Sequence, residues 1–363
     1  MTKKILFVSY TADRTGPTNS LLLLLKYLRK RFNVAVLLPE QGLFSETLQR
    51  EQIPYFSFPD LSKRAIPAIY SLIKQERFDL VYGNSTDGSS RNALIAAKLA
   101  RIPFICHVRA MATGRSWYKH IYLNFADAVV VVSQSCADSL RGRVVNHKLR
   151  VVHNGIDDVN FRDKDCNRNK ITTELNLIDK SPVIVTVGHL KPMKGQHYAL
   201  QVVNEIIKKW DSVVLLIAGS HDRDRVYVQK IKSLIRSMGL EKQVRLLGFR
   251  DDVLDLLLLA DVYLHTSLEE AHPRSIIEAM ACGLPVVAFS VGGVPETVVN
   301  GQTGYIVPSG DIDAMSQVVK KLVGDRNLWK RFGKNGQQRV RENFLAEKTA
   351  QKVGNIIDKT FKK

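Results

Sequence analysis

The chain has 363 residues, of which 45% are hydrophobic and 24% charged, and its formal net charge is +18. This composition is that of packed globular proteins, and it excludes a disordered chain, a collagen-like chain and a small disulfide scaffold. At about 150 residues per domain, the length predicts roughly two domains. The surplus of Lys and Arg favours anionic partners such as nucleotides or phospholipid headgroups, although a basic surface also simply aids solubility.

The hydrophobic segments are too short to cross a membrane. Apolar runs such as residues 21–25 and 128–132 span five residues, whereas a bilayer requires about 20. The apolar start at residues 5–8 gives way to polar and charged residues without a small-residue cleavage site, so we interpret it as a buried strand rather than a signal peptide. The four cysteines form no Cys-x-x-Cys pair, which argues against a zinc or redox motif and fits a reducing cytoplasm.

In the first half of the chain, short β-branched runs alternate with segments of helical periodicity. The strands are expected at residues 5–9, 34–38, 80–82, 104–107, 128–132 and 149–152. The helices are expected at residues 19–31, 63–77, 90–101, 117–125 and 135–141. Strands that alternate with helices predict a parallel sheet, and strands that are continuously apolar predict a sheet covered on both faces.

A polar, aperiodic stretch at residues 157–170 is the best candidate for a linker, and a second series of the same kind follows it. Its strands are expected at residues 183–187, 213–218, 244–246, 262–265, 285–289 and 305–307. Its helices are expected at residues 195–209, 226–238, 252–260, 275–281 and 312–322, and the basic stretch 328–361 is also helical. We therefore predict a Rossmann-like domain over residues 1–165, a second over 166–340, and a C-terminal helix over 341–363 that packs back toward the first domain.

This organisation predicts the α/β class, with two doubly wound parallel sheets that face each other across a cleft. In open sheets of this kind, ligands bind outside the carboxyl ends of the strands. The residues that follow the predicted strands are therefore the candidate functional residues.

The strongest chemical signal lies between the predicted strand 262–265 and the predicted helix 275–281. Residues 270–287 read EAHPRSIIEAMACGLPVV, which places Glu270 in the loop and Glu278 about one turn inside the helix. The free amides at the start of this helix form an anion site. Amides suited to a diphosphate, beside carboxylates suited to hydroxyls, predict a sugar-nucleotide site, although Glu270 could instead be only a charge that caps the helix.

This motif resembles the signature of retaining glycosyltransferase family 4, which has the GT-B fold. Further segments resemble that family in order and at plausible spacing: residues 126–133 (ADAVVVVS), 152–157 (VHNGID), 187–190 (VGHL), 194–197 (KGQH), 292–296 (GGVPE) and 300–304 (NGQTG). The resemblance runs from about residue 100 to about residue 310 and is specific as a set. The first 100 residues or so match more loosely, through Gly16 and the fold pattern.

The resemblance implies transfer of a hexose-type sugar from a nucleotide donor, with a UDP-sugar favoured, to an acceptor hydroxyl with retention of the anomeric configuration. It implies that Glu278 holds the ribose hydroxyls, that Glu270 orients the donor hexose, and that Lys194 neutralises the departing diphosphate. The donor-binding residues are then Gly16, Gly188, His189, Lys194, Glu270, Arg274, Ser275, Glu278 and Gly293.

The first domain supplies further candidates at its strand ends. Because Gly16 has no Cβ, it lets a donor phosphate or an acceptor approach the backbone, unless it marks only a tight turn. His107 resembles the family histidine that touches the transferred sugar, and we group it with Glu270 and Lys194 as catalytic, although a lone histidine at a strand end is often structural. Asn84 and Arg109 are candidates on the acceptor side.

His189 departs from the family pattern, in which the donor loop reads Gly-Arg-Leu. Imidazole has a reference pKa of about 6.5 and is mostly neutral at pH 7, although a nearby diphosphate favours its protonated form. Three interpretations stay open. His189 acts as a conditional cation, Lys191 or Arg274 supplies the charge, or the activity is weakened.

We expect no metal or other cofactor, because Lys194 and backbone amides meet the charge of the phosphates. The Asp-x-Asp pairs at residues 163/165, 222/224 and 311/313 fit loops and helix caps better than a metal site. No recognition motif for nucleic acid accompanies the positive charge. The expected acceptor is a glycan or lipid-linked glycan in the synthesis of lipopolysaccharide, capsule or exopolysaccharide.

A basic and aromatic surface in the first domain suits an anionic membrane, and would place the protein in the cytoplasm and peripherally on the membrane face. Its residues are Lys26, Arg29, Lys30, Arg31, Lys63, Arg64, Arg109, Arg115, Trp117, Tyr118, Lys119 and Tyr122. An ordinary helix with its aromatic side chains turned inward explains part of the same pattern.

Two other function classes compete with a transferase. A non-catalytic regulatory homologue that binds nucleotide sugars has His189 as its only support. A nicotinamide-dependent oxidoreductase is disfavoured, because no Gly-x-Gly-x-x-Gly follows the first strand of either domain.

Overall fold

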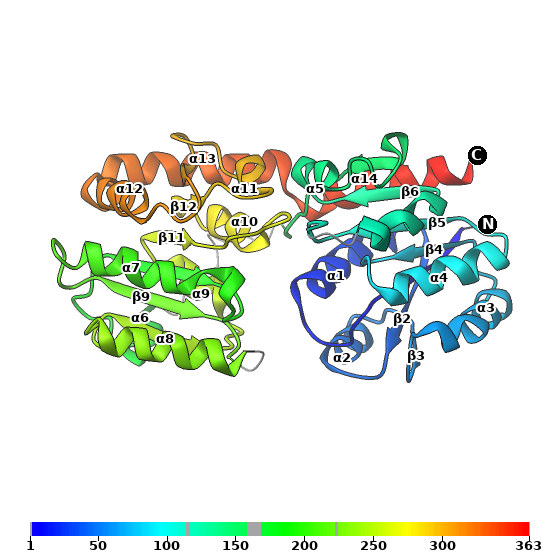
Figure 1. The fold of residues 1–363 in the computed structure, drawn as a ribbon, viewed down its shortest axis with the longest axis horizontal. Coiled ribbons are helices and arrows are strands. Elements are labelled where there is room, and N and C mark those ends of the chain that lie inside the picture. The colour runs from blue at the N-terminus through cyan, green and yellow to red at the C-terminus, as the bar shows by residue number, and fades with distance from the viewer. Residues whose placement is uncertain (1, 114–116, 158–167, 222–223, 363) are drawn as a thin grey trace. The chain divides into compact units, whose positions relative to one another are not determined.

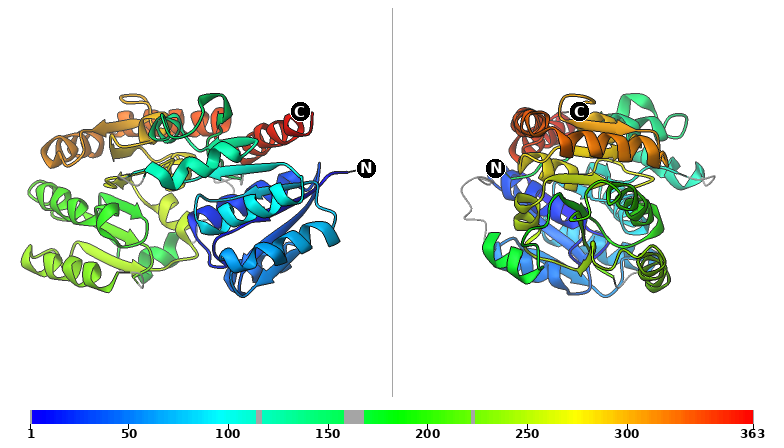
Figure 2. Two further views of the ribbon diagram at one scale, coloured as in Figure 1. Left: turned by 45° about the vertical axis from the view of Figure 1, so that its right-hand side comes forward. Right: turned by 90° about the vertical axis from the view of Figure 1, so that its left-hand side faces the viewer.

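The computed structural model describes residues 2–113, 117–157, 168–221 and 224–362. The chain forms two compact units, one of Met1–Asp157 with Phe344–Lys363 and one of Asp158–Asn343. Each unit holds one parallel sheet with helices on both faces (Figures 1 and 2). The predicted pair of doubly wound α/β sheets is therefore confirmed. Within the described ranges, no helix is both long and apolar enough to span a bilayer.

The sheet of the first unit has seven strands in the order β3-β2-β1-β4-β5-β6-β7. The strands are β1 Lys4–Val8, β2 Asn33–Pro39, β3 Tyr55–Phe58, β4 Leu80–Gly83, β5 Phe104–Val108, β6 Ala128–Val131 and β7 Leu149–Val151. The helices are α1 Gly16–Leu28, α2 Leu43–Arg50, α3 Ile66–Gln75, α4 Gly88–Leu99, α5 Gln134–Ser139 and α14 Ala346–Phe361, with 3₁₀ turns at Lys63–Ala65, Trp117–Phe125 and Asn146–Lys148. In the central strand β1, Ile5 pairs with both Val34 and Leu80 and is fully buried, which explains the unbroken apolar run.

The sheet of the second unit has six strands in the order β10-β9-β8-β11-β12-β13. The strands are β8 Val183–Val187, β9 Val214–Ala218, β10 Val244–Gly248, β11 Val262–His265, β12 Val286–Phe289 and β13 Gly304–Val307. The helices are α6 Arg168–Glu174, α7 Gln196–Ile206, α8 Arg225–Ser237, α9 Val253–Leu259, α10 Arg274–Ala281, α11 Val294–Thr297, α12 Ile312–Gly324 and α13 Arg326–Asn343, with a 3₁₀ turn at Pro192–Lys194. Side chains of α7, α8 and α12 pack with β8 and β9 in one buried core.

The predicted helix over residues 328–361 is wrong in one respect, because the chain breaks it into α13 and α14. Between them, the amide of Ile156 donates to the Phe344 carbonyl at 2.9 Å, and the amide of Ala346 donates to the Ile156 carbonyl at 2.8 Å. These bonds to a distant segment replace helical ones. The helix α14 then packs against α1 in the first unit, where Gly354 leaves room for Arg31.

Other differences concern short or weakly patterned elements. The elements β3, α2, α6 and α11 were not predicted, and residues 117–125 form a 3₁₀ helix rather than an α-helix. All four residues of β3 are only partly buried, so the strand lacks the apolar signature of its neighbours. Part of the predicted linker, residues 168–170, lies in α6, and residues 158–167 lie outside the described part of the chain.

Candidate active site

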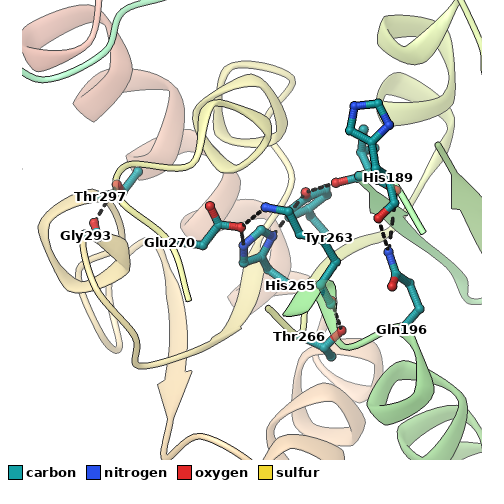
Figure 3. Close-up of polar contacts among 11 residues, drawn as sticks. His189, Gln196, Tyr263, His265, Thr266, Glu270, Gly293 and Thr297 are labelled. Carbon is teal, nitrogen blue, oxygen red and sulfur yellow. Dashed lines mark hydrogen bonds and ion pairs between the residues drawn. The ribbon is translucent and has the colours of Figure 1, made fainter. Parts of the chain in front are cut away.

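In the second unit, a loop after β11 carries Glu270 into contact with two cationic or donor side chains. One carboxylate oxygen of Glu270 accepts a hydrogen bond from Lys194 Nζ at 2.5 Å and another from His265 Nε2 at 3.0 Å (Figure 3). Lys194 ends the 3₁₀ turn after β8, and His265 is the last residue of β11. The carboxyl ends of two neighbouring strands therefore supply one charged cluster, as the sheet topology requires.

The Glu270 carboxylate keeps its charge although it is largely buried. Burial alone would raise its pKa, but the hydrogen bond from His265 and the charge of Lys194 outweigh that effect and hold the pKa well below its ordinary value of 4.5. The Glu270 side chain is only 10% exposed, so these interactions act with little screening by water.

Glycine residues allow close backbone contacts on both sides of this cluster, at the segments that carry Glu270 and Lys194. The amide of Gly293 donates to the Glu270 carbonyl at 3.0 Å, and Gly292 lies so close that a Cβ would stand 1.7 Å from the same oxygen. Gly195 follows Lys194 with a φ of 65°, and a Cβ there would stand 2.0 Å from the Thr266 carbonyl oxygen. Larger residues at Gly292 or Gly195 would displace the segments that hold Glu270 and Lys194 together.

Glu278 lies on α10, where its carboxylate accepts a hydrogen bond from Arg274 at 3.1 Å. The buried hydroxyl of Tyr263 lies within electrostatic range of both carboxylates, Glu270 and Glu278. Burial, reinforced by these charges, raises the pKa of Tyr263 well above 10.0. Pro273 directly precedes α10 and is its N-cap residue.

The loop after β8 contains Gly188 and His189. The side-chain amide of Gln196 donates to the His189 carbonyl at 3.0 Å, which fixes the backbone of this loop. The imidazole of His189 does not point toward the Glu270 carboxylate (Figure 3). The structure thus joins Lys194, Glu270 and Gly293 in one cluster, while His189 contributes to its surroundings through the backbone.

In the first unit, His107 is buried at the end of β5. Its Nδ1 lies 2.8 Å from the Tyr82 hydroxyl and 3.2 Å from Arg109 Nη2. Burial and the charge of Arg109 lower the pKa of His107 well below 6.5, so the ring is neutral. Asn84 accepts a hydrogen bond from Arg109 Nε at 2.7 Å and donates to the Pro17 carbonyl at 3.2 Å.

The three predicted residues His107, Asn84 and Arg109 therefore form one network, and Asn84 connects it to the segment after Gly16. A Cβ at Gly16 would meet no atom within 4 Å, so packing does not demand a glycine there. In this network the Arg109 side chain is directed toward His107 and Asn84 of its own unit.

The predicted basic and aromatic surface is wrong at two positions. Arg109 bonds inside the unit, and the hydroxyl of Tyr122 is buried. Arg115 and the side chains of residues 117–119 lie outside the described part. The remaining members, Lys26, Arg29, Lys30, Arg31, Lys63 and Arg64, are exposed.

The sequence interpretation missed His265, Tyr263 and Tyr82. A signal for His265 existed, because a histidine ends an otherwise apolar strand two residues after a tyrosine, which places both on one face. The Asp-x-Asp pair at Asp311 behaves as expected of a cap, since its carboxylate accepts a hydrogen bond from the Ala314 amide at 2.9 Å. Asp163, Asp165 and Asp222 lie outside the described residues.

Both halves of the chain match known family models. Residues 14–159 match the model described as Glycosyltransferase Family 4, and residues 167–339 match Glycosyl transferases group 1. Among curated proteins, the Escherichia coli UDP-Gal:alpha-D-GlcNAc-diphosphoundecaprenol alpha-1,3-galactosyltransferase is 26% identical, over 90% of this chain and 89% of that one. The N-acetyl-alpha-D-glucosaminyl L-malate synthase of Bacillus anthracis is 27% identical, over 64% of this chain and 59% of that protein.

Solved protein structures also resemble this chain. The Anabaena protein HepE in complex with UDP and glucose has a TM-score of 0.89 and 25% identity, over 98% of this chain and all of that one. A glycosyltransferase from Rickettsia africae has a TM-score of 0.90 over 99% of both chains, and its 21% identity speaks for the fold alone. The chain therefore belongs to the glycosyltransferases of family 4 and has the GT-B fold.

Proposed function

We propose that the protein is a retaining hexosyltransferase that uses a UDP-sugar and extends a cell-surface glycan. The observation that carries this proposal is the contact of Lys194 and His265 with one oxygen of Glu270, at the carboxyl edge of the second sheet. A fixed cation beside a fixed carboxylate suits a ligand that has an anionic diphosphate next to a hydroxyl-bearing sugar. The presence of UDP and UDP-glucose in the HepE structures supports uridine as the base.

The donor would be held by charges and backbone of the second unit. Lys194 faces the diphosphate, Glu270 accepts hydrogen bonds from the hexose hydroxyls, and Glu278 accepts those of the ribose. Arg274 provides a second cation, and its buried Nε has no hydrogen-bond partner among the residues that the structure describes. Arg274 lies beside Glu278, whereas the imidazole of His189 does not point toward the Glu270 carboxylate (Figure 3), and this difference favours Arg274 over His189 as the substitute for the missing arginine of the donor loop. The Ser275 hydroxyl and the backbone at Gly188 and Gly293 complete the contacts.

In the proposed reaction, the bond between the sugar C1 and the diphosphate oxygen breaks while the acceptor oxygen bonds to C1 from the same face. The acceptor proton passes to the released phosphate oxygen, so no protein base is needed. Lys194 stabilises the negative charge that grows on the leaving group, an effect of about 3–4 kcal/mol per donor in comparable sites. Because protein cations meet this charge, we propose that activity is independent of divalent metal and withstands EDTA.

For the acceptor, we propose a lipid-linked glycan. The E. coli relative is named for such an acceptor, a sugar on diphosphoundecaprenol. The exposed Arg29 and Lys30 after α1 offer charge for an anionic membrane face, whereas Lys26 is paired with Asp157 at 2.7 Å. Vesicles with and without anionic lipid test this part: we expect co-sedimentation with anionic vesicles at low salt only, and equal binding to neutral vesicles would refute it.

A panel of nucleotide sugars tests the donor. At a concentration of 100 times its Kd, the true donor adds about 2.7 kcal/mol to the free energy of unfolding. For a domain of the size of the second unit, this raises the Tm by roughly 5–10 °C. With an acceptor present, the wild type should release UDP, and Lys194→Ala should lose at least 100-fold while the exposed control Lys230→Ala does not. Product NMR then reads the anomeric configuration. Binding without UDP release would favour the non-catalytic homologue, and an inverted product would refute retention.

A further inference from the structure

One guanidinium group in the first unit ties together the ends of three strands. Arg109 follows β5 and donates through Nε to Asn84 at 2.7 Å, through Nη1 to Asn154 at 3.0 Å and through Nη2 to His107 Nδ1 at 3.2 Å. Asn84 follows β4, Asn154 follows β7, and His107 lies in β5. Because the guanidinium is planar and its donors form a rigid fork, three such bonds fix its orientation.

These contacts determine where the proton of His107 resides. A guanidinium only donates hydrogen bonds, and it stays protonated in proteins. Nδ1 of His107 is therefore an acceptor, and the Tyr82 hydroxyl at 2.8 Å donates to the same nitrogen. A neutral imidazole carries its single proton on the other nitrogen. Burial and the neighbouring charge of Arg109 keep the ring neutral by lowering its pKa, so Nε2 carries the hydrogen.

Among the described residues, that hydrogen has no acceptor. Nε2 of His107 is buried, and it has no hydrogen-bond partner within the described ranges of the chain. The side chain is 1% exposed and stands at the carboxyl end of a central strand, where ligands of open sheets bind. Buried N–H groups are normally satisfied, so one that the protein leaves unpaired at such an edge is a donor reserved for a ligand.

We propose that Arg109 is a positioning residue that holds His107 as the Nε2–H tautomer, so that the histidine that resembles the sugar-contacting one of the family meets its ligand as a hydrogen-bond donor only. In this state Nε2 has no lone pair to accept a proton, and His107 does not act as a base toward the acceptor hydroxyl. The part of this inference that concerns the substrate rests on the proposed function. The tautomer itself follows from the contacts of the first unit alone.

The tautomer is measured directly by ¹⁵N NMR of the full-length protein labelled at histidine, with the His107 signals assigned through His107→Gln. We expect a proton on Nε2, a bare Nδ1, and no titration of this ring between pH 8 and 5.5. The titratable and charged groups that face it are Tyr82 on β4 and Arg109 beyond β5. A proton on Nδ1, or a ring that titrates near 6.5, would overturn the inference whether or not the protein transfers a sugar.

The role of Arg109 is tested by Arg109→Met, with Arg109→Lys as a milder variant and the exposed Arg50→Met as control. In Arg109→Met we expect His107 to titrate closer to pH 6.5 and to mix its tautomers, and kcat for UDP release to fall 10- to 100-fold with KM changed less than 3-fold. Arg109→Lys, which keeps the charge, should leave the ring neutral and reduce kcat less.

Unchanged tautomer and titration in the folded Arg109→Met variant would overturn the role of Arg109. Addition of the UDP-sugar and acceptor should shift the His107 Nε2–H signal, and an unchanged signal during turnover would overturn the contact with substrate. If no nucleotide sugar supports turnover while the tautomer is as expected, the proposed function fails and the assignment of the proton stands.

Discussion

Replacing Gly292 by alanine tests whether the backbone contact at Glu270 sets the donor site. Gly292 has a φ of 48°, and a Cβ would lie 1.7 Å from the Glu270 carbonyl oxygen, where real contacts do not fall below 3.0 Å. The two segments must therefore separate by more than 1 Å. A left-handed alanine costs about 1–2 kcal/mol, and with the displaced loop we expect Gly292→Ala to lower the free energy of unfolding by about 3–5 kcal/mol.

Gly301 provides a matched control in the same unit. Its φ is 73°, so alanine meets the same backbone cost there, but a Cβ would have no atom within 4 Å. A displacement of about 1 Å in a catalytic group costs on the order of 100-fold. We expect Gly292→Ala to lose about that factor in kcat/KM for UDP release, and Gly301→Ala less than 3-fold. Equal activities of the two variants, measured below the Tm of each, would refute this role of the backbone contact at Gly292.

Three other predictions concern the charges of the second unit. Because the pKa of Glu270 is lowered on folding, the stabilisation by its charge is present above pH 4.5 and is lost as the pH falls through the folded pKa. In urea titrations below pH 4.5, the difference in unfolding free energy between wild type and Glu270→Gln should shrink by up to about 1.4 kcal/mol per pH unit. A difference that stays constant with pH would contradict this prediction. His265→Leu removes a donor from Glu270 and should reduce UDP release about 10-fold, while His265→Gln, which keeps an N–H at the same reach, should stay within 3-fold; equal losses would show that only packing matters. Arg274→Met should raise the donor KM at least 10-fold and His189→Phe less than 3-fold in the same assay, and the reverse order would return the role of the missing cation to His189.

The sequence predicted most of the strands because both sheets are parallel and covered on both faces. Strands such as β6 and β9 are buried throughout, so each reads as one apolar run. The strand β3 lies at a sheet edge and is partly buried at every position, which leaves no such pattern. The break between α13 and α14 depends on backbone bonds to Ile156, about 190 positions earlier, and no local propensity encodes it.

For the candidate site too, the sequence predicted what is local and missed what depends on distant contacts. Glu270, Lys194 and His107 could be proposed from the sequence because each follows or ends a predicted strand, and its motif or side-chain chemistry can be recognised without knowledge of its neighbours in space. Their partners were missed because contacts across strands decide them. Arg109 was assigned to the acceptor side, yet the fold turns it toward His107, Asn84 and Asn154.

The two units repeat one arrangement, and the comparison clarifies both. In each, a histidine near the carboxyl end of a strand has a tyrosine hydroxyl at its Nδ1, Tyr82 for His107 at 2.8 Å and Tyr263 for His265 at 3.4 Å. The carboxylate beside His265 Nε2, which only accepts, and the guanidinium beside His107 Nδ1, which only donates, each place a proton on Nε2. In the second unit Glu270 accepts that proton's hydrogen bond, whereas in the first unit the described residues offer no acceptor. The N–H that binds a carboxylate in the second unit thus has no acceptor among the described residues of the first unit, and this contrast supports our proposal that a substrate oxygen accepts from His107.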